Sequence, residues 1–197
     1  MTQHLNIEQV ASLRPDFLGL IFYDKSPRNV TLPSLPKTQG IAHVGVFVNA
    51  SLDVIIQKAT AFNLEVVQLH GDETPAFCNM VKKELPAVKI WKAFGVDEHF
   101  DFSSLVDFIP MVDSFLFDTK TVLRGGSGTQ FDWQVLNNYT FKTSIIISGG
   151  IGLEQIAALK ELLKTKLPIE VIDLNSRFEE APGLKDYNKL KTFFDAI

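Results

Sequence analysis

Seven short apolar runs recur along the chain, and stretches with helical spacing separate them. The runs are rich in Val, Ile and Phe and alternate little with polar residues, which is typical of parallel strands buried on both faces. Segments between them, such as 51–63 and 153–166, show the spacing of amphipathic helices. Strands that alternate with helices predict an α/β protein with a parallel sheet. The predicted strands cover 17–23, 41–48, 66–70, 88–94, 114–119, 144–147 and 169–175.

These strands recur with a nearly constant period. Their first residues lie about 25 residues apart, a repeat that fits a (β/α)8 barrel. No linker or change of composition interrupts the repeat, so we expect one domain over residues 1–197. The chain opens with a helical pattern at 6–13, for which Asn6 is the expected N-cap, and closes with another at 186–197. The pattern therefore predicts a barrel to which these residues contribute seven strands, with the first strand missing.

The composition is that of a globular protein and excludes several classes of partner. The 197 residues are 46% hydrophobic and 21% charged, and the formal net charge of -4 gives no basic surface for nucleic acid. No apolar run approaches the roughly 18 residues of a membrane-spanning helix. The first residues lack the pattern of a signal peptide, and the single cysteine, Cys78, excludes an internal disulfide. We expect a cytoplasmic protein that binds neither nucleic acid nor membrane.

Three side chains lie where such barrels carry reactive groups, at the carboxyl ends of strands and in the loops that follow. Asp118 ends a strand and can act as a general acid, or it can simply cap its loop. Arg28 follows the first strand and can bind a carboxylate or phosphate bidentately, although a solvated arginine is the commoner case. His70 ends the third strand and can contact a ligand or be a satisfied histidine of the rim.

Two strand ends near the C-terminus carry small or hydrogen-bonding residues. Gly149 and Gly150 follow one apolar run, and Asn175 and Ser176 follow the next. Backbone N–H groups at such ends can hold a phosphate dianion, commonly after the last two strands of a barrel. The alternative is a pair of ordinary strands with glycine turns. A further glycine-rich stretch, 125–128, is either a loop that folds over a ligand or a plain connection. No His, Asp or Glu group has metal-ligand spacing, so no metal is expected.

With these residues in place, the chain resembles the phosphoribosylanthranilate isomerase family of tryptophan biosynthesis over nearly its full length. The resemblance implies a TIM barrel of the ribulose-phosphate-binding type. It also implies an Amadori rearrangement of N-(5-phosphoribosyl)anthranilate to 1-(2-carboxyphenylamino)-1-deoxyribulose 5-phosphate, without cofactor or metal. The expected partner is this phosphorylated small molecule, and the expected state is a monomer or homodimer. The stretches that carry the resemblance are FLGLIFYDKSPRNV, HVGVFVNASLD, VVQLHGDETPAFC, IWKAF, FLFDTK, GGSGTQFDW, ISGGI and IDLNSRFEEAPGLKD.

The resemblance also implies roles for the candidate residues. Asp118 matches the general acid that opens the furanose ring, Arg28 matches the arginine that faces the anthranilate carboxylate, and His70 matches the histidine of the QLHG motif. Asp173 matches a position that lines the pocket. The phosphate cup is matched by Gly149, Gly150, Asn175 and Ser176, with Arg177 standing where many members carry a small residue.

One departure from the family concerns its general base. Members open with a strand close to K-I-C-G-M-T, whose cysteine removes the C2 proton of the sugar. These residues begin Met1-Thr2, so we expect the base to be absent from them and the activity of this exact chain to be weak. Cys78 lies in a helical pattern, away from any strand end, and is not expected to replace it.

Two alternatives stay open at this point. The first is a non-catalytic barrel that binds a phosphorylated ligand without turnover. The second is another phosphate-binding barrel, such as indoleglycerol-phosphate synthase or a pentose-phosphate epimerase. The synthase requires rim lysines on early strands, of which only Lys92 is a weak reminder, and the epimerase requires metal-binding histidines and aspartates that the sequence does not show.

Overall fold

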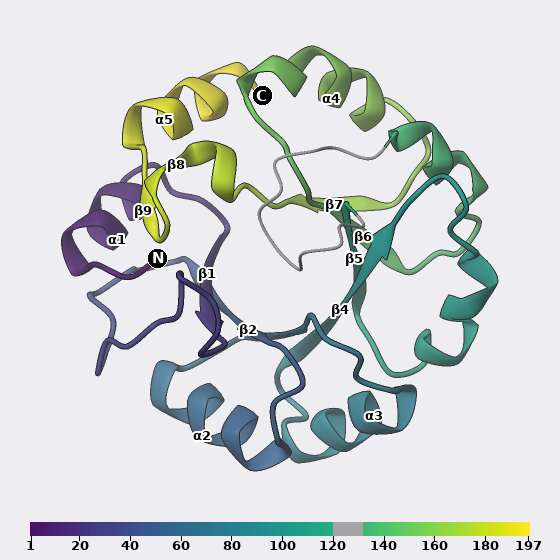
Figure 1. Cartoon of the computed structure of the whole chain (residues 1–197), viewed down its shortest axis with the longest axis horizontal. Coiled ribbons are helices and arrows are strands. Elements are labelled where there is room, and N and C mark those ends of the chain that lie inside the picture. Colours follow the sequence, from purple (N-terminus) through teal and green to yellow (C-terminus); the bar gives the residue numbers. More distant parts are fainter. Residues whose placement is uncertain (120–131) are drawn as a thin grey trace.

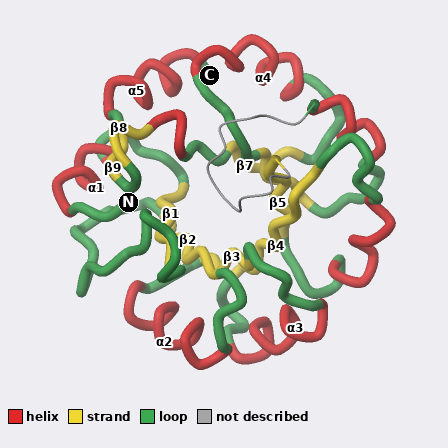
Figure 2. The backbone as a smooth tube through the Cα atoms, in the orientation of Figure 1, coloured by secondary structure: helices red, strands yellow, loops and turns green. Residues whose placement is uncertain are grey.

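Seven parallel strands curve around a common centre in the computed structural model, and helices surround them (Figures 1 and 2). The structure describes residues 1–119 and 132–197, so the glycine-rich stretch 125–128 lies outside the described residues. Each strand pairs with its neighbours in chain order. The strands are β1 (Phe17–Phe22), β2 (Ala42–Phe47), β3 (Val66–Leu69), β4 (Lys89–Val96), β5 (Ser114–Thr119), β6 (Ser144–Ile147) and β7 (Ile169–Ile172).

Helices or 3₁₀ turns connect most of the strands on the outside of the sheet. After β4 and β5 the connections contain 3₁₀ helices, and a short antiparallel hairpin follows β7. The α-helices are α1 (His4–Ala11), α2 (Leu52–Phe62), α3 (Pro75–Glu84), α4 (Ile156–Leu163) and α5 (Tyr187–Ala196). The 3₁₀ helices are η1 (Phe102–Phe108), η2 (Trp133–Asn138), η3 (Leu153–Gln155) and η4 (Ser176–Phe178), and the hairpin strands are β8 (Glu179–Ala181) and β9 (Leu184–Lys185).

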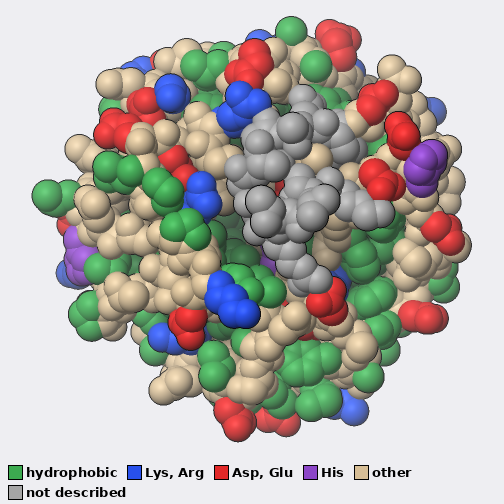
Figure 3. All heavy atoms as spheres, viewed as in Figure 1, with side chains coloured by type: hydrophobic (Ala, Val, Ile, Leu, Met, Phe, Trp, Pro, Cys, Tyr) green, Lys and Arg blue, Asp and Glu red, His purple; other side chains and the backbone are tan. Residues whose placement is uncertain are grey.

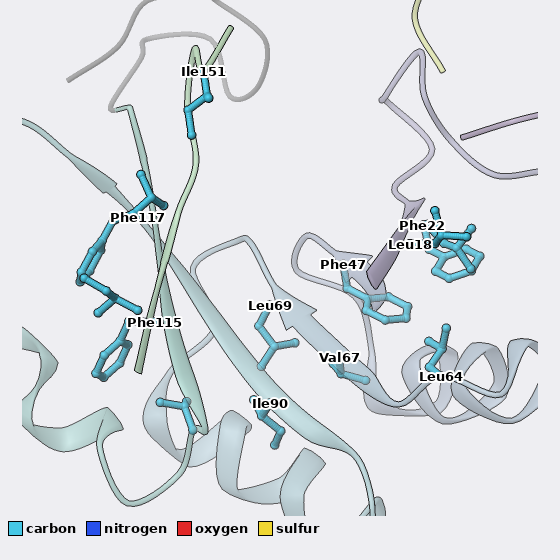
Figure 4. Close-up of a cluster of buried hydrophobic side chains, with 14 of the residues drawn as sticks. Leu18, Phe22, Phe47, Leu64, Val67, Leu69, Ile90, Phe115, Phe117 and Ile151 are labelled. Atoms are coloured by element: carbon cyan, nitrogen blue, oxygen red, sulfur yellow. The ribbon is translucent and has the colours of Figure 1, made fainter. Parts of the chain in front are cut away.

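Alternation along each strand divides the buried side chains into two clusters. Because successive strand residues point to opposite faces, one set packs against the helices and the other fills the centre. Figure 4 shows part of the outer cluster, with Phe47, Val67, Leu69 and Ile90 projecting from β2, β3 and β4. The inner cluster is smaller and comprises Val44, Val66, Trp91, Ala93, Leu116 and Ile146. This division fixes which polar residues at the strand ends can reach the centre.

The sheet has two edges. Within the described residues, β7 pairs only with β6. Among the strands β1 pairs only with β2, and its Ile21 also forms an isolated parallel bridge with Asn29. Residues 1 and 2 lie near the β1 edge, where the amino group of Met1 donates to the carbonyl oxygen of Gly19 at 3.4 Å. The backbone N–H of Thr2 donates to the carbonyl oxygen of Gly183, at 3.1 Å, in the turn between β8 and β9. The N-terminal residues therefore connect β1 to the hairpin that follows β7.

The seven predicted strands are confirmed, with ends that differ by a few residues, and the parallel order is confirmed with them. The expected cap of the first helix is wrong. Helix α1 begins at His4, and Gln3 occupies the N-cap position without a side-chain bond. The amide group of Asn6 instead exchanges two hydrogen bonds of 2.8 Å with the backbone of Lys185. A contact to a residue far along the chain therefore prevails over the local capping preference.

Candidate functional site

A cavity of about 230 Å³ lies at the centre of the ring of strands. Figure 3 views the molecule onto the same face as Figure 1, where basic side chains stand near the middle. Residues of six strands of the parallel sheet, β1 to β5 and β7, line the cavity together with the loop that follows β6. All eight residues predicted for the site line this cavity: Arg28, His70, Asp118, Gly149, Gly150, Asp173, Asn175 and Ser176.

The two-residue period of the strands explains why these polar groups face inward. On β5, Leu116 belongs to the inner cluster, so Asp118, two residues on, points to the same side. On β6, Ile146 is an inner residue, and Ser148 follows it at the same spacing. The same relation connects Val171 of β7 with Asp173, which also lines the cavity. The polar residues that follow β6 and β7, and the one near the end of β5, therefore point into the same cavity as the inner apolar residues of these strands.

Asp118 and His70 face one another across this space. Nε2 of His70 lies 3.6 Å from Oδ2 of Asp118. Nδ1 of His70 lies 2.8 Å from Nε2 of the buried Gln68, and an amide nitrogen can only donate, so Nδ1 is the acceptor. The neutral imidazole therefore carries its proton on Nε2, toward Asp118. The other carboxylate oxygen of Asp118 accepts from the backbone N–H of Thr119 at 2.7 Å, which fixes the orientation of the carboxylate.

The turn after β6 is shaped by two glycines with positive φ. Gly149 has φ 87° and Gly150 has φ 64°, a region that non-glycine residues rarely adopt. Gly149 also approaches Asp118 closely, since a Cβ at this position would lie 2.6 Å from Oδ1 of Asp118. No hydrogen bond found within the described residues uses the backbone N–H of Gly149, Gly150 or Asn175. These donors border the cavity and suit an anionic group.

Asp173 is the second carboxylate of the cavity. Burial raises the pKa of Asp173, and the negative charge of Asp118 acts in the same direction. A hydrogen bond of 2.9 Å from Oγ of Ser148 and the positive charge of Lys185 oppose this rise. Asp173 is therefore easier to protonate than an exposed aspartate.

Arg28 is held in place by Glu179, a partner that the sequence reasoning missed. Nε of Arg28 donates to both carboxylate oxygens of Glu179, at 3.1 and 2.8 Å, and its terminal nitrogen lies 2.8 Å from Oε2. Lys185 lies 3.2 Å from the same carboxylate and donates to Oδ1 of Asn175 at 2.7 Å. A chain of contacts therefore connects Arg28 to the loop after β7. Both Glu179 and Lys185 lie in the stretch RFEEAPGLKD, but nothing in that stretch indicates Arg28 as their partner.

Glu179 makes the stability conferred by its contacts with Arg28 and Lys185 dependent on pH. Burial acts to raise the pKa of Glu179, but the hydrogen bonds from Arg28 and the charge of Lys185 outweigh it and hold the pKa below the usual 4.5. A carboxylate with a lowered pKa stabilises the folded state above its unfolded pKa, and this contribution disappears as the pH falls through the folded value. We expect the free energy of unfolding, measured by urea titration at several pH values, to fall below about pH 4.5, and part of this slope to vanish in Glu179→Gln.

The Glu179→Gln variant is also expected to be less stable at neutral pH. Removal of one partner from a buried ion pair costs about 3–5 kcal/mol, because the remaining charges stay buried without compensation. Glu180→Gln is the matched control, since Glu180 is the exposed neighbour on the same strand. Equal acid slopes in the wild type and both variants would show that the pKa of Glu179 is not lowered.

Four further observations concern the described part of the chain. Residues 1–119 and 132–197 contain no group of three or more His, Cys, Asp or Glu side chains that could hold a metal ion. Cys78 is fully buried on α3, and burial raises the pKa of its thiol to about 11. Arg177 does not line the cavity, and its Nη1 lies 3.3 Å from Oε1 of Glu154.

Within residues 1–119 and 132–197, no helix has the length and apolar character required to cross a bilayer.

Comparison with known proteins agrees with this geometry. Residues 1–196 match the family model described as N-(5′-phosphoribosyl)anthranilate (PRA) isomerase. The N-(5′-phosphoribosyl)anthranilate isomerase of Parabacteroides distasonis is 38% identical over 203 residues, an alignment that covers 100% of this chain and 90% of the relative. That of Phocaeicola vulgatus is 34% identical over 197 residues and covers 100% of this chain and 94% of the relative.

Solved structures show the same fold. The phosphoribosyl anthranilate isomerase of Thermotoga maritima superposes with a TM-score of 0.81 at 27% identity, covering 100% of this chain and 94% of that one. Another phosphoribosyl anthranilate isomerase structure, at 25% identity and a TM-score of 0.78, contains reduced 1-(o-carboxyphenylamino)-1-deoxyribulose 5-phosphate and is covered to the same extent. The fold is thus a (β/α)8 fold with seven strands in these residues. This chain belongs to the N-(5′-phosphoribosyl)anthranilate isomerase family.

Proposed function

We propose that this protein isomerises N-(5′-phosphoribosyl)anthranilate to 1-(2-carboxyphenylamino)-1-deoxyribulose 5-phosphate, a step of tryptophan biosynthesis. The single observation that carries the proposal is the arrangement of Asp118 in one cavity with two groups of anion-binding residues. Gly149, Gly150, Asn175 and Ser176 form one group, and Arg28 belongs to the other. A substrate with a phosphate at one end and a carboxylate at the other matches this arrangement. The family supplies the identity of that substrate.

Asp118 is the proposed general acid. In its protonated form it donates to the ring oxygen of the furanose while the C1–O bond breaks, and the lone pair of the anthranilate nitrogen forms the C=N bond of a Schiff base. Loss of the C2 proton returns electrons to that nitrogen as an enolamine, which becomes the ketone by proton transfer. Reactant and product are isomers, so the steps need no oxidant. His70, 3.6 Å from the carboxylate, and the Thr119 N–H hold Asp118 in one orientation.

The two ends of the substrate are proposed to bind on opposite sides of Asp118. The phosphate binds the backbone donors after β6 and β7, where no hydrogen bond found within the described residues uses the N–H groups of Gly149 and Gly150. The anthranilate carboxylate binds Arg28, whose guanidinium is oriented by Glu179. Asp173 lines the same cavity, and the Ser148 hydroxyl donates to its carboxylate at 2.9 Å. Anchoring both ends places the ring oxygen beside the acid, which is how positioning contributes to rate.

The C2 proton also requires a base. Cys78 does not serve, because it is buried on α3. In the family this group is expected on a strand of the type Lys-Ile-Cys. A positioned general base contributes typically about 10²–10⁴-fold, so a form of the protein that carries such a strand ahead of Met1 is the natural comparison.

The experiment measures the loss of anthranilate fluorescence from N-(5′-phosphoribosyl)anthranilate in two forms of the protein. One is the 197-residue chain, and the other carries the Lys-Ile-Cys strand before Met1. We expect turnover in the extended form and much slower turnover in the 197-residue chain. Tight binding of the reduced product analogue with no turnover in either form would favour the non-catalytic binding protein. Failure of both forms to bind it would overturn the proposal.

We further propose that residues 1–197 act as one domain, as a monomer or homodimer in the cytoplasm. A dimeric phosphoribosylanthranilate isomerase from Thermotoga maritima is among the structural neighbours, which supports the dimer as one of the two states. The unbroken order of seven strands supports one domain. The net charge of -4 argues against a nucleic acid partner. Equilibrium sedimentation of the purified chain separates monomer from dimer.

A further inference from the structure

A buried lysine lies on the outer face of β4, beneath the rim loop that begins at His70. Lys92 is only 2% exposed, and its ammonium group donates to the carbonyl oxygens of Leu69, Gly71 and Ala93 at 3.2, 2.9 and 3.0 Å. It also lies 3.3 Å from Oε2 of Glu73, whose side chain is 3% exposed. Its neighbours in the chain, Trp91 and Ala93, belong to the inner cluster, so Lys92 points away from the cavity. The proposed site does not use it, since Lys92 does not line the cavity.

Glu73 holds the same loop from the other side. Its two carboxylate oxygens accept from the backbone N–H of Asn49 at 2.7 Å and of Gly71 at 2.9 Å. The N–H of Gly71 therefore binds Glu73 while its carbonyl oxygen binds Lys92. The space around this residue is fully occupied, since a Cβ on Gly71 would lie 2.4 Å from Oδ1 of Asn49. The loops after β2 and β3 are thus joined through one pair of buried charges.

Stability alone does not account for this pair. Taking two charges out of water is costly, and apolar residues of the same volume often stabilise a protein equally well or better. Burial lowers the pKa of Lys92, while the charge of Glu73 opposes that change. What the pair supplies, and apolar residues cannot, is a set of directed hydrogen bonds to the peptide groups on both sides of Gly71. These bonds specify one conformation of the loop.

His70 immediately precedes Gly71 and is therefore fixed by the same contacts. Its backbone N–H donates to the carbonyl oxygen of Phe47 at 2.8 Å, and its imidazole faces Asp118. We propose that Lys92 and Glu73 are positioning residues that hold the His70 imidazole, with its Nε2 proton, against the Asp118 carboxylate. Neither residue lines the cavity. The consequence for turnover rests on the proposed function, whereas the consequence for the imidazole does not.

The first test reads the imidazole directly, without substrate. The chain contains four histidines, so ¹⁵N spectra of the histidine-labelled full chain resolve each ring, and His70→Asn assigns its signals. We expect a single Nε2–H tautomer of His70 in the wild type. In Lys92→Met we expect a mixture of tautomers at His70, while the signals of His4, His43 and His99 stay in place. If Lys92→Met does not fold, Glu73→Gln, which preserves the side-chain volume, is measured in its place, and the same mixture of His70 tautomers is expected.

Leu159→Ala is the matched control, because Leu159 is fully buried on α4, in a different part of the outer layer. It loses stability without touching the β3 loop, so its His70 tautomer is expected to stay unchanged. An unaltered tautomer in folded Lys92→Met or Glu73→Gln would overturn the proposal. A mixture of tautomers in Leu159→Ala would also overturn it, since lost stability would then explain the effect.

The second test uses turnover in the extended form. A misplaced catalytic group can cost about 10²-fold in rate, so we expect Lys92→Met to lower kcat/KM by about 10–100-fold in the wild-type background. In the His70→Ala background the same substitution is expected to have almost no effect, because the group that it displaces is gone. Additive losses would contradict the positioning role. A change of tautomer together with no turnover in any form would instead count against the proposed function.

Discussion

Asp118→Asn is expected to reduce kcat by about 10²–10⁴-fold in the extended form of the protein, which is the usual contribution of a positioned general acid. The amide has the same shape as the carboxyl group, and its oxygen can still accept from the Thr119 N–H. It cannot deliver a proton to the furanose oxygen. Because the anion-binding residues are untouched, the dissociation constant of the reduced product analogue should remain close to that of the wild type. Stopped-flow fluorescence with the substrate and calorimetric titration with the analogue measure the two quantities separately.

Asp107→Asn is the matched control for this substitution. Asp107 lies on η1 with an exposed side chain, so the variant has the same change of net charge outside the cavity. Its kcat should equal that of the wild type. If Asp118→Asn retained full turnover, Asp118 would lose its role as the acid. If it lost turnover and analogue binding together, the carboxylate would be a binding group and not a proton donor.

The positions of the strands could be predicted because two independent signals coincide in the sequence. Buried parallel strands leave apolar runs, and the barrel spaces them at about 25 residues. The sequence also allows the prediction that the Asp118 side chain points inward, because Asp118 follows Leu116 of the same apolar strand by two residues. The same period contradicts one weak suggestion from the sequence. Lys92 is not a rim lysine of the synthase type, because Trp91 and Ala93 occupy the inner face of β4.

The partners of the site residues could not be predicted, because they are distant in the chain. Arg28 and Glu179 are separated by 151 residues, and only the folded sheet brings the loop after β1 beside the hairpin after β7. Asn6 is a second example, in which a local sequence preference gave a wrong prediction. Its position before a helical run favours an N-cap, yet its amide binds the backbone of Lys185, 179 residues away. Local propensity is a weak preference that a tertiary hydrogen bond readily outweighs.

Gly149→Ala is the second substitution expected to have a large effect, and it acts through geometry alone. At φ 87° an alanine is strained by about 1–2 kcal/mol. Its Cβ would also lie 2.5–2.6 Å from Oγ1 and the backbone nitrogen of Thr119 and from Oδ1 of Asp118. Relief of such overpacking typically costs about 1–3 kcal/mol more. The shift displaces both the acid and the backbone donors proposed for phosphate, so kcat/KM should fall by about 10²-fold or more in the extended form.

Gly40→Ala separates the two causes. Gly40 has a similar φ of 78°, but nothing lies within 4 Å of the position that a Cβ would occupy. It therefore carries the backbone strain without the collision, and its free energy of unfolding should fall by only about 1–2 kcal/mol with no change in kcat/KM. Urea titration and the fluorescence assay on both variants give the comparison. Equal losses of stability in the two variants would mean that Thr119 and Asp118 can shift away from the added Cβ at no cost. In that case, the close packing of Gly149 against Asp118 would not be what positions the acid.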